Sequence, residues 1–100
     1  MNIQQLMKQA QTMQADMLKA EQELAAKVTI VDRQGVKVSM NGVFELKSVT
    51  IDEQLLKPEN KAIIEDILMM NINRLTKQIQ DERAETVGEL TQGLKIPGVM

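Results

Sequence analysis

Cysteine and histidine are both absent from this chain of 100 residues. Their absence excludes disulfides, thiolate nucleophiles, imidazole bases and the usual zinc ligands. No nucleophile paired with a base, no metal cluster and no phosphate-binding loop can be assembled from the remaining residues. We therefore expect a protein that is not an enzyme and that needs neither a cofactor nor a metal.

Aromatic residues are almost as scarce, since Phe44 is the only one. Recognition of single-stranded nucleic acid by base stacking relies on aromatic side chains, so it is not expected here. No apolar run approaches the roughly 18 residues needed to span a bilayer, and polar residues such as Gln4 and Lys8 interrupt the N-terminal segment. These absences predict a soluble cytoplasmic protein with no membrane partner and no small-molecule substrate.

The first segment has the pattern of a long helix with one narrow apolar stripe. Its apolar residues recur alternately three and four positions apart, as in a heptad seam: Ile3, Leu6, Ala10, Met13, Met17, Ala20 and Leu24. A helix over residues 2 to 26 would be about 38 Å long. So thin an apolar stripe must lie against another helix, and a chain this short can complete its core by sharing it with a second copy.

After this helix the apolar period changes to two, which predicts β-strands. The alternating residues are Val28 and Ile30 in a first strand, then Val36, Val38 and Met40 in a second. The turn between them contains Asp32, Arg33, Gln34 and Gly35. An antiparallel hairpin with one buried face follows from this pattern.

Two loops can join the second strand to a third around Asn41 and Gly42. A two-residue type I′ loop would send Phe44 and Leu46 to the polar face of the sheet. A three-residue loop with Gly42 in the left-handed region instead groups both with the apolar residues of the second strand, and we favour it.

The third strand changes phase partway along its length. After Leu46 the apolar residues are Val49 and Ile51, which are odd-numbered. Continued burial on one face therefore requires an extra residue, a β-bulge, near Lys47 and Ser48. The predicted sheet is antiparallel and three-stranded.

A second long helix is predicted from about Glu59 to Gln92. Asp52 can cap a short turn before it, and Pro58 suits a first helical position. The first half of this helix is apolar on more than one side, which favours packing on the sheet and on a partner at once, whereas its second half is thinner and can run antiparallel to the first helix. Gly93 is a reasonable C-cap, and the tail after it is expected to be extended.

Charge is unevenly distributed along the chain, whose net charge is −2. Residues 1–15 contain no acid, carry Lys8 and five glutamines, and place them near the positive end of a helix dipole. A second acid-free window, residues 67–80, holds Arg74 and Lys77. For one copy of the chain, a solvated polar face explains the glutamines better than phosphate contact. A symmetric dimer would present two such helix ends to one duplex and so favours phosphate contact.

Five motifs occur along the chain in a characteristic order and spacing: LMKQAQTMQADM at residues 6–17, VKVSMNG at 36–42, SVTID at 48–52, IIEDIL at 63–68 and IPG at 96–98. Together they resemble the YbaB/EbfC family of bacterial nucleoid-associated proteins. The resemblance implies an α+β protomer of order α-β-β-β-α. It also implies a tweezer-like homodimer whose projecting helices engage double-stranded DNA.

Under this resemblance residues 1–100 form a single domain. It comprises a helical arm (1–26), an antiparallel sheet (27–52), a long helix (59–92) and an extended tail (93–100). Two departures from the family pattern are basic. Arg33 lies where the family has a glycine-rich loop, and Arg74 replaces an acid in the segment from Asn71, so both become candidate phosphate contacts.

The leading hypothesis is a nucleoid-associated homodimer that binds double-stranded DNA mainly through phosphates, with little sequence specificity. It would influence nucleoid organisation and gene expression. The candidate DNA-binding residues are Gln5, Lys8, Gln9, Arg33, Arg74 and Lys77. The alternative is a protein-interaction module whose helical arms bind another protein, with DNA binding weak or indirect.

Overall fold

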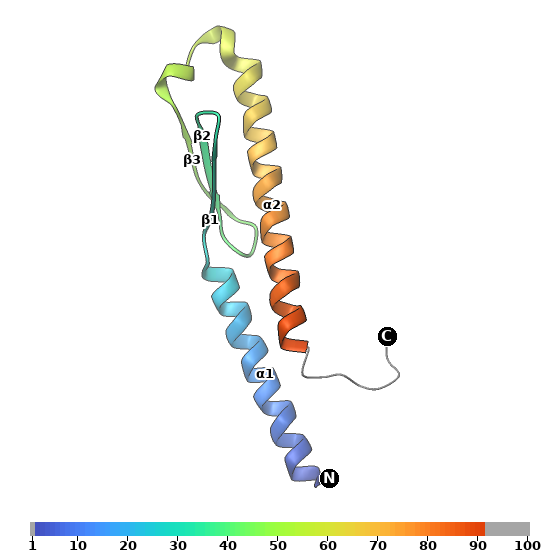
Figure 1. Cartoon of the computed structure of the whole chain (residues 1–100). Helices are drawn as coiled ribbons and strands as arrows, with labels where there is room; N and C mark the ends of the chain where they lie inside the picture. Colours follow the sequence, from blue (N-terminus) through green and yellow to red (C-terminus); the bar gives the residue numbers. More distant parts are fainter. Residues whose placement is uncertain (1, 92–100) are drawn as a thin grey trace.

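The computed structural model describes residues 2–91 and has principal extents of 70 × 26 × 13 Å (Figure 1). Its elements are, in order, α1 (Ile3–Ala26), β1 (Thr29–Arg33), β2 (Val36–Met40), β3 (Leu46–Ile51), the 3₁₀ turns η1 (Glu53–Leu55) and η2 (Pro58–Asn60), and α2 (Lys61–Thr91). The predicted α+β class and element order are confirmed. Within the described residues, no helix combines the length and apolar character that crossing a membrane requires.

The predicted helix boundaries agree with the structure to within two residues where it describes them. Asn2 caps α1 by accepting a hydrogen bond from the Gln4 amide. Pro58 lies at the first position of the short turn η2 and not of the long helix. The long helix α2 begins after that turn, at Lys61. The predicted C-cap at Gly93 and the extended tail lie outside the described residues.

The β1–β2 turn and the bulge in β3 fix the register of the sheet, whose order is β1-β2-β3. Gln34 and Gly35 both have positive φ, 58° and 82°, which gives the two-residue type I′ turn that matches strand twist. Ser39 pairs with Ser48, but the next pair is Met40 with Leu46. Lys47 is thus the extra residue, and the predicted bulge is confirmed.

The β2–β3 loop has the predicted three residues, but Gly42 is not its left-handed residue. The Asn41 amide donates to the Glu45 carbonyl at 3.0 Å, closing the loop around residues 42–44. Phe44 adopts the positive φ, at 65°. Gly42 is required for a different reason: a Cβ there would lie 1.7 Å from the Leu24 carbonyl oxygen at the end of α1. The loop and the helix therefore pack backbone to backbone.

The core forms where one face of α2 covers β1 and β2. On α2 the buried side chains recur every four residues, at Ile67, Asn71, Leu75 and Ile79. They pack on the buried apolar side chains of the sheet, which are Val31, Val36, Val38 and Met40. Figure 1 shows α2 running along one side of the sheet and continuing beside α1.

The assignment of Val28 and Ile30 as the apolar alternation of β1 was wrong. Ile30 pairs with Ser39 on the outer face of the sheet and is 53% exposed, and Val28 precedes the strand and is also exposed. Val31, opposite Val38, is the buried residue. The local run of apolar residues was compatible with either phase, and packing against α2 selects Val31.

Asn71 is the one polar residue in the buried row on α2, and it joins the helix to the β1–β2 hairpin. Its side-chain nitrogen donates to the carbonyls of Arg33 and Val36, at 3.2 and 2.9 Å. The side chain is fully buried; its bond to Val36 is buried and its bond to Arg33 is partly buried. Without this amide, two carbonyls next to the turn would each lose a side-chain donor.

Replacement of Asn71 by leucine, which is similar in size and cannot donate, should lower the free energy of unfolding by about 3 kcal/mol, because two carbonyls lose their donor. Urea unfolding at a fixed protein concentration measures this. Asn73→Leu is the matched control: Asn73 is exposed on the same helix, and its change should stay within about 0.5 kcal/mol. Equal effects at both positions would contradict the role of Asn71.

Two glycine-to-alanine substitutions should have opposite signs. Gly42→Ala places a Cβ against the Leu24 carbonyl and should destabilise the fold by about 3 kcal/mol through overpacking. Gly88→Ala lies inside α2, where a Cβ meets nothing within 4 Å, and should stabilise by about 1 kcal/mol through helix propensity. The same urea titration reports both, and a neutral Gly42→Ala would contradict the close approach of loop and helix.

Candidate nucleic-acid interface

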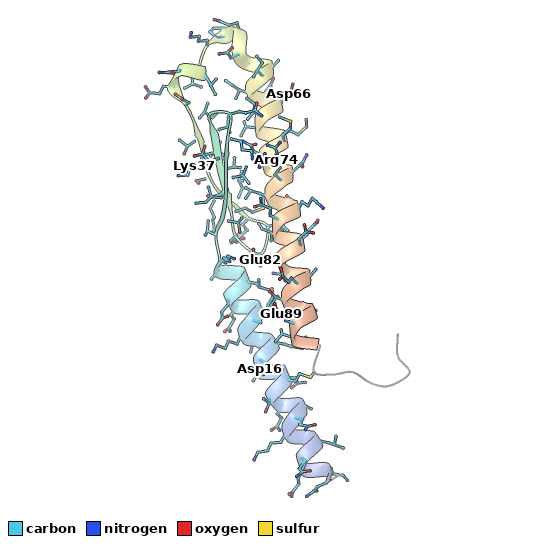
Figure 2. All side chains as sticks on the ribbon, viewed as in Figure 1. Asp16, Lys37, Asp66, Arg74, Glu82 and Glu89 are labelled. Carbon is cyan, nitrogen blue, oxygen red and sulfur yellow. The ribbon has the colours of Figure 1, made fainter. Side chains whose placement is uncertain are left out.

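The first half of α1 projects from the body of the molecule as an arm. Figure 1 shows α1 continuing well past the end of α2, and Figure 2 places Asp16 near the level at which α2 ends. No residue of α1 is buried. Of the predicted heptad seam, Met13, Ala20 and Leu24 are half-buried, whereas Ile3, at 73%, is largely exposed. The seam is therefore covered by α2 only over its second half.

Three of the six predicted DNA-binding residues, Gln5, Lys8 and Gln9, come together on this arm. They lie at spacings of three and four, which places them on one helix face. They line an open groove of about 710 Å³ between α1 and the end of α2. The other lining residues are Thr12, Met13, Asp16 and Leu90. The groove thus carries amide donors, a hydroxyl, one ammonium group and one carboxylate beside two apolar side chains.

The other three predicted residues form a second group on the body. Arg74 donates from its guanidinium to Asn71 Oδ1 at 3.4 Å, and Asn71 also binds the carbonyl of Arg33. Lys77 follows Arg74 by one helical turn. The two groups are well separated, because α1 from Lys8 to its end is about 27 Å long and β1 adds about 13 Å.

The salt bridges within the described residues show which of the predicted basic residues already have an acidic partner. Lys27 pairs with Glu82, Arg83 with Glu21, and Lys77 with Asp81, the last at 3.9 Å between exposed groups. Within residues 2–91, Lys8, Arg33 and Arg74 take part in no salt bridge. Their charge is therefore available to an external anion, while that of Lys77 is partly compensated.

Thr12 and Asp16 are groove residues that the sequence analysis did not select. The signal was present, since Thr12 lies four residues after Lys8 and Asp16 seven after Gln9, which are positions on the same helix face. The Thr12 hydroxyl donates to the Lys8 carbonyl at 2.9 Å. Among the described residues, no group of three metal-ligating side chains was found.

Comparison with known proteins identifies the family of this chain. The model of the YbaB/EbfC DNA-binding family matches residues 1–94. A nucleoid-associated protein of Pelotomaculum thermopropionicum is 37% identical over 98% of this chain and 95% of its own length. One of Anaeromyxobacter dehalogenans is 34% identical over 99% and 98%.

A solved structure has a similar fold. The crystal structure of the uncharacterized protein HP0035 from Helicobacter pylori superposes with a TM-score of 0.74 and 25% identity, covering 90% of this chain and 97% of that one. Family model, relatives and fold agree over nearly the full length. The chain belongs to the YbaB/EbfC DNA-binding family of bacterial nucleoid-associated proteins.

Proposed function

We propose that this protein binds double-stranded DNA as a homodimer, chiefly through phosphate contacts with low sequence specificity. In the cytoplasmic nucleoid it would thereby influence DNA organisation and gene expression. The observation that carries the proposal is the projecting, acid-free first half of α1, with Lys8 and its neighbouring glutamines on one face. Membership of a DNA-binding family supports it.

The chemistry of the arm suits a phosphate backbone better than base edges. Lysine acts as a flexible point charge for phosphate, and glutamine side chains donate hydrogen bonds to phosphate oxygens as readily as to bases. The first turn of α1 contains no acid, so the helix dipole favours an anion there. With few cations per arm, one chain would bind weakly, and two arms on one duplex would bind more tightly.

The surface that α2 leaves uncovered supports the homodimer. Leu46 and Val49 of β3 lie on the same face of the sheet as Met40 and Val38, yet each remains 44% exposed. The first half of α2 exposes further apolar residues, Ile63, Met69 and Met70. Such an area on a small chain suits burial against a second copy.

In this proposal the six predicted residues have two roles. Gln5, Lys8 and Gln9 make the primary contacts on the arm. Arg33, Arg74 and Lys77 form a secondary basic group that a duplex meets when it lies along the length of the molecule. Since Lys77 shares its charge with Asp81, it contributes least.

A mobility-shift titration of duplex DNA at 50 and 200 mM salt tests the assignment. The double substitution Lys8→Glu with Arg74→Glu should weaken binding by at least about tenfold at the lower salt, because each change removes an unpaired cation. Lys8→Gln alone should reduce the slope of log K against log salt by about 2 per dimer, one phosphate contact in each copy.

The matched control for the charge reversals is Lys57→Glu with Lys61→Glu, which changes the net charge equally but at the far end of the molecule from the arm. Equal losses in both double variants would mean that only net charge matters. No binding by the unmodified chain at 50 mM salt would favour the alternative, a protein-interaction module that uses the exposed apolar residues of the arm, such as Leu6 and Met7.

Neighbouring substitutions on β3 test the homodimer. Val49→Glu places a charge on the uncovered apolar face and should convert the dimer to a monomer at micromolar concentration, measured by size exclusion with light scattering. Thr50→Glu carries the same charge on the opposite face of the same strand and should leave the dimer intact. A monomeric unmodified chain would contradict the shared core.

A further inference from the structure

Arg83 connects three elements at the base of the arm. One nitrogen of its guanidinium, on α2, donates to the Gly42 carbonyl of the β2–β3 loop at 2.8 Å. The other donates to both carboxylate oxygens of Glu21, on α1, at 2.8 and 2.7 Å. One side chain thus joins α1, the sheet and α2 through three charge-assisted hydrogen bonds, two of them to a carboxylate.

Apart from the contacts around Arg83, few contacts attach the arm to the body of the molecule. The Leu24 carbonyl packs against Gly42 with no room for a Cβ. Side chains of α1 that face α2 are at most half-buried. A second ion pair joins Lys27 to Glu82; these side chains are 57% and 31% accessible, against 27% and 49% for Arg83 and its carboxylate partner on α1. The Lys27 side chain makes one hydrogen bond to one element, whereas Arg83 makes three to two elements, so Arg83 is the stronger polar link.

We infer that Arg83 is a positioning residue for DNA binding: with Glu21 and the Gly42 carbonyl it sets the direction of the arm without itself touching DNA. This inference rests on the proposed function. The leverage is large, because Lys8 lies about 20 Å along the helix from Glu21. A tilt of about 10° at the junction would move Lys8 by about 3.5 Å, close to the rise along the duplex axis between successive phosphates of one strand.

Glu21→Gln separates this role from simple electrostatics. The substitution makes the chain less acidic, so net charge alone predicts tighter DNA binding. Loss of the charged fork with Arg83 predicts weaker binding, by about fivefold, because the arm loses its fixed direction. The matched control is Glu23→Gln, an exposed residue of α1 that makes no salt bridge in the described part of the chain and changes the charge equally.

The arm direction itself can be measured without DNA. Because the chain has no cysteine, spin labels at Gln4→Cys and Gln78→Cys, both exposed, give a distance between α1 and α2. An excess of unlabelled chain restricts the signal to distances within one copy. The distance distribution should broaden about twofold in Glu21→Gln and in Arg83→Gln, less in Arg83→Lys, which keeps the charge but not the fork, and not at all in Glu23→Gln.

A broadened distribution together with weaker DNA binding in Glu21→Gln, and neither change in Glu23→Gln, is the expected result. An unchanged distribution in Glu21→Gln and Arg83→Gln would overturn the inference, as would a broadened one with undiminished DNA affinity. Failure of the proposed function is separate, since it appears as absence of DNA binding by the unmodified chain at low salt. Thermal unfolding of each variant identifies any that fails to fold. If Arg83→Gln does not fold, Glu21→Gln, at an exposed position, still breaks the contact between Arg83 and α1.

Discussion

The single helix α2 is the element to which the rest of the molecule is attached. Its first half packs on β1 and β2 through the row from Ile67 to Ile79, and its second half runs beside α1. Because an α-helix is continuous and stiff, the sheet and the arm are both held to one rod. Asn71 anchors that rod to the β1–β2 turn and Arg83 anchors it to the arm. The relative placement of arm and sheet follows from these two side chains and the apolar row.

One helix has neither the width nor the length to cover everything it supports. Across the sheet, α2 reaches β1 and β2 and leaves Leu46 and Val49 on β3 half exposed. Along the chain, it ends at Thr91 and leaves the first half of α1 uncovered. The two surfaces differ chemically: the first is apolar and suits a second copy, whereas the second mixes polar and apolar side chains, is free of acids and suits an anion. The fold itself thus separates the proposed dimer contact from the proposed DNA contact.

Local patterns predicted most of this fold, and tertiary contacts account for the failures. The heptad spacing fixed α1, and the phase change after Leu46 fixed the bulge at Lys47, because both follow from side-chain periodicity. The sequence could not tell that Phe44 takes the left-handed position, because Gly42 appeared to be kept for conformational freedom when it is kept for contact with α1. Likewise Arg83 lies in a charged stretch of helix, and the periodicity of that stretch could not predict its hydrogen bond to Gly42, in a loop 41 residues away.

The position of the acids matters more for DNA binding than their excess. Glu21, Asp81 and Glu82 are each paired with a cation, and because each pair is neutral the net charge stays at −2. What a duplex meets at the end of the arm depends on how far the acids lie from it. The first acid in the sequence, Asp16, lies about 12 Å along the helix from Lys8 and about 21 Å from Asn2. Both separations exceed the screening length of about 8 Å at physiological salt. The end of the arm can therefore attract phosphates although the chain as a whole is acidic, provided that the arm is held away from the body.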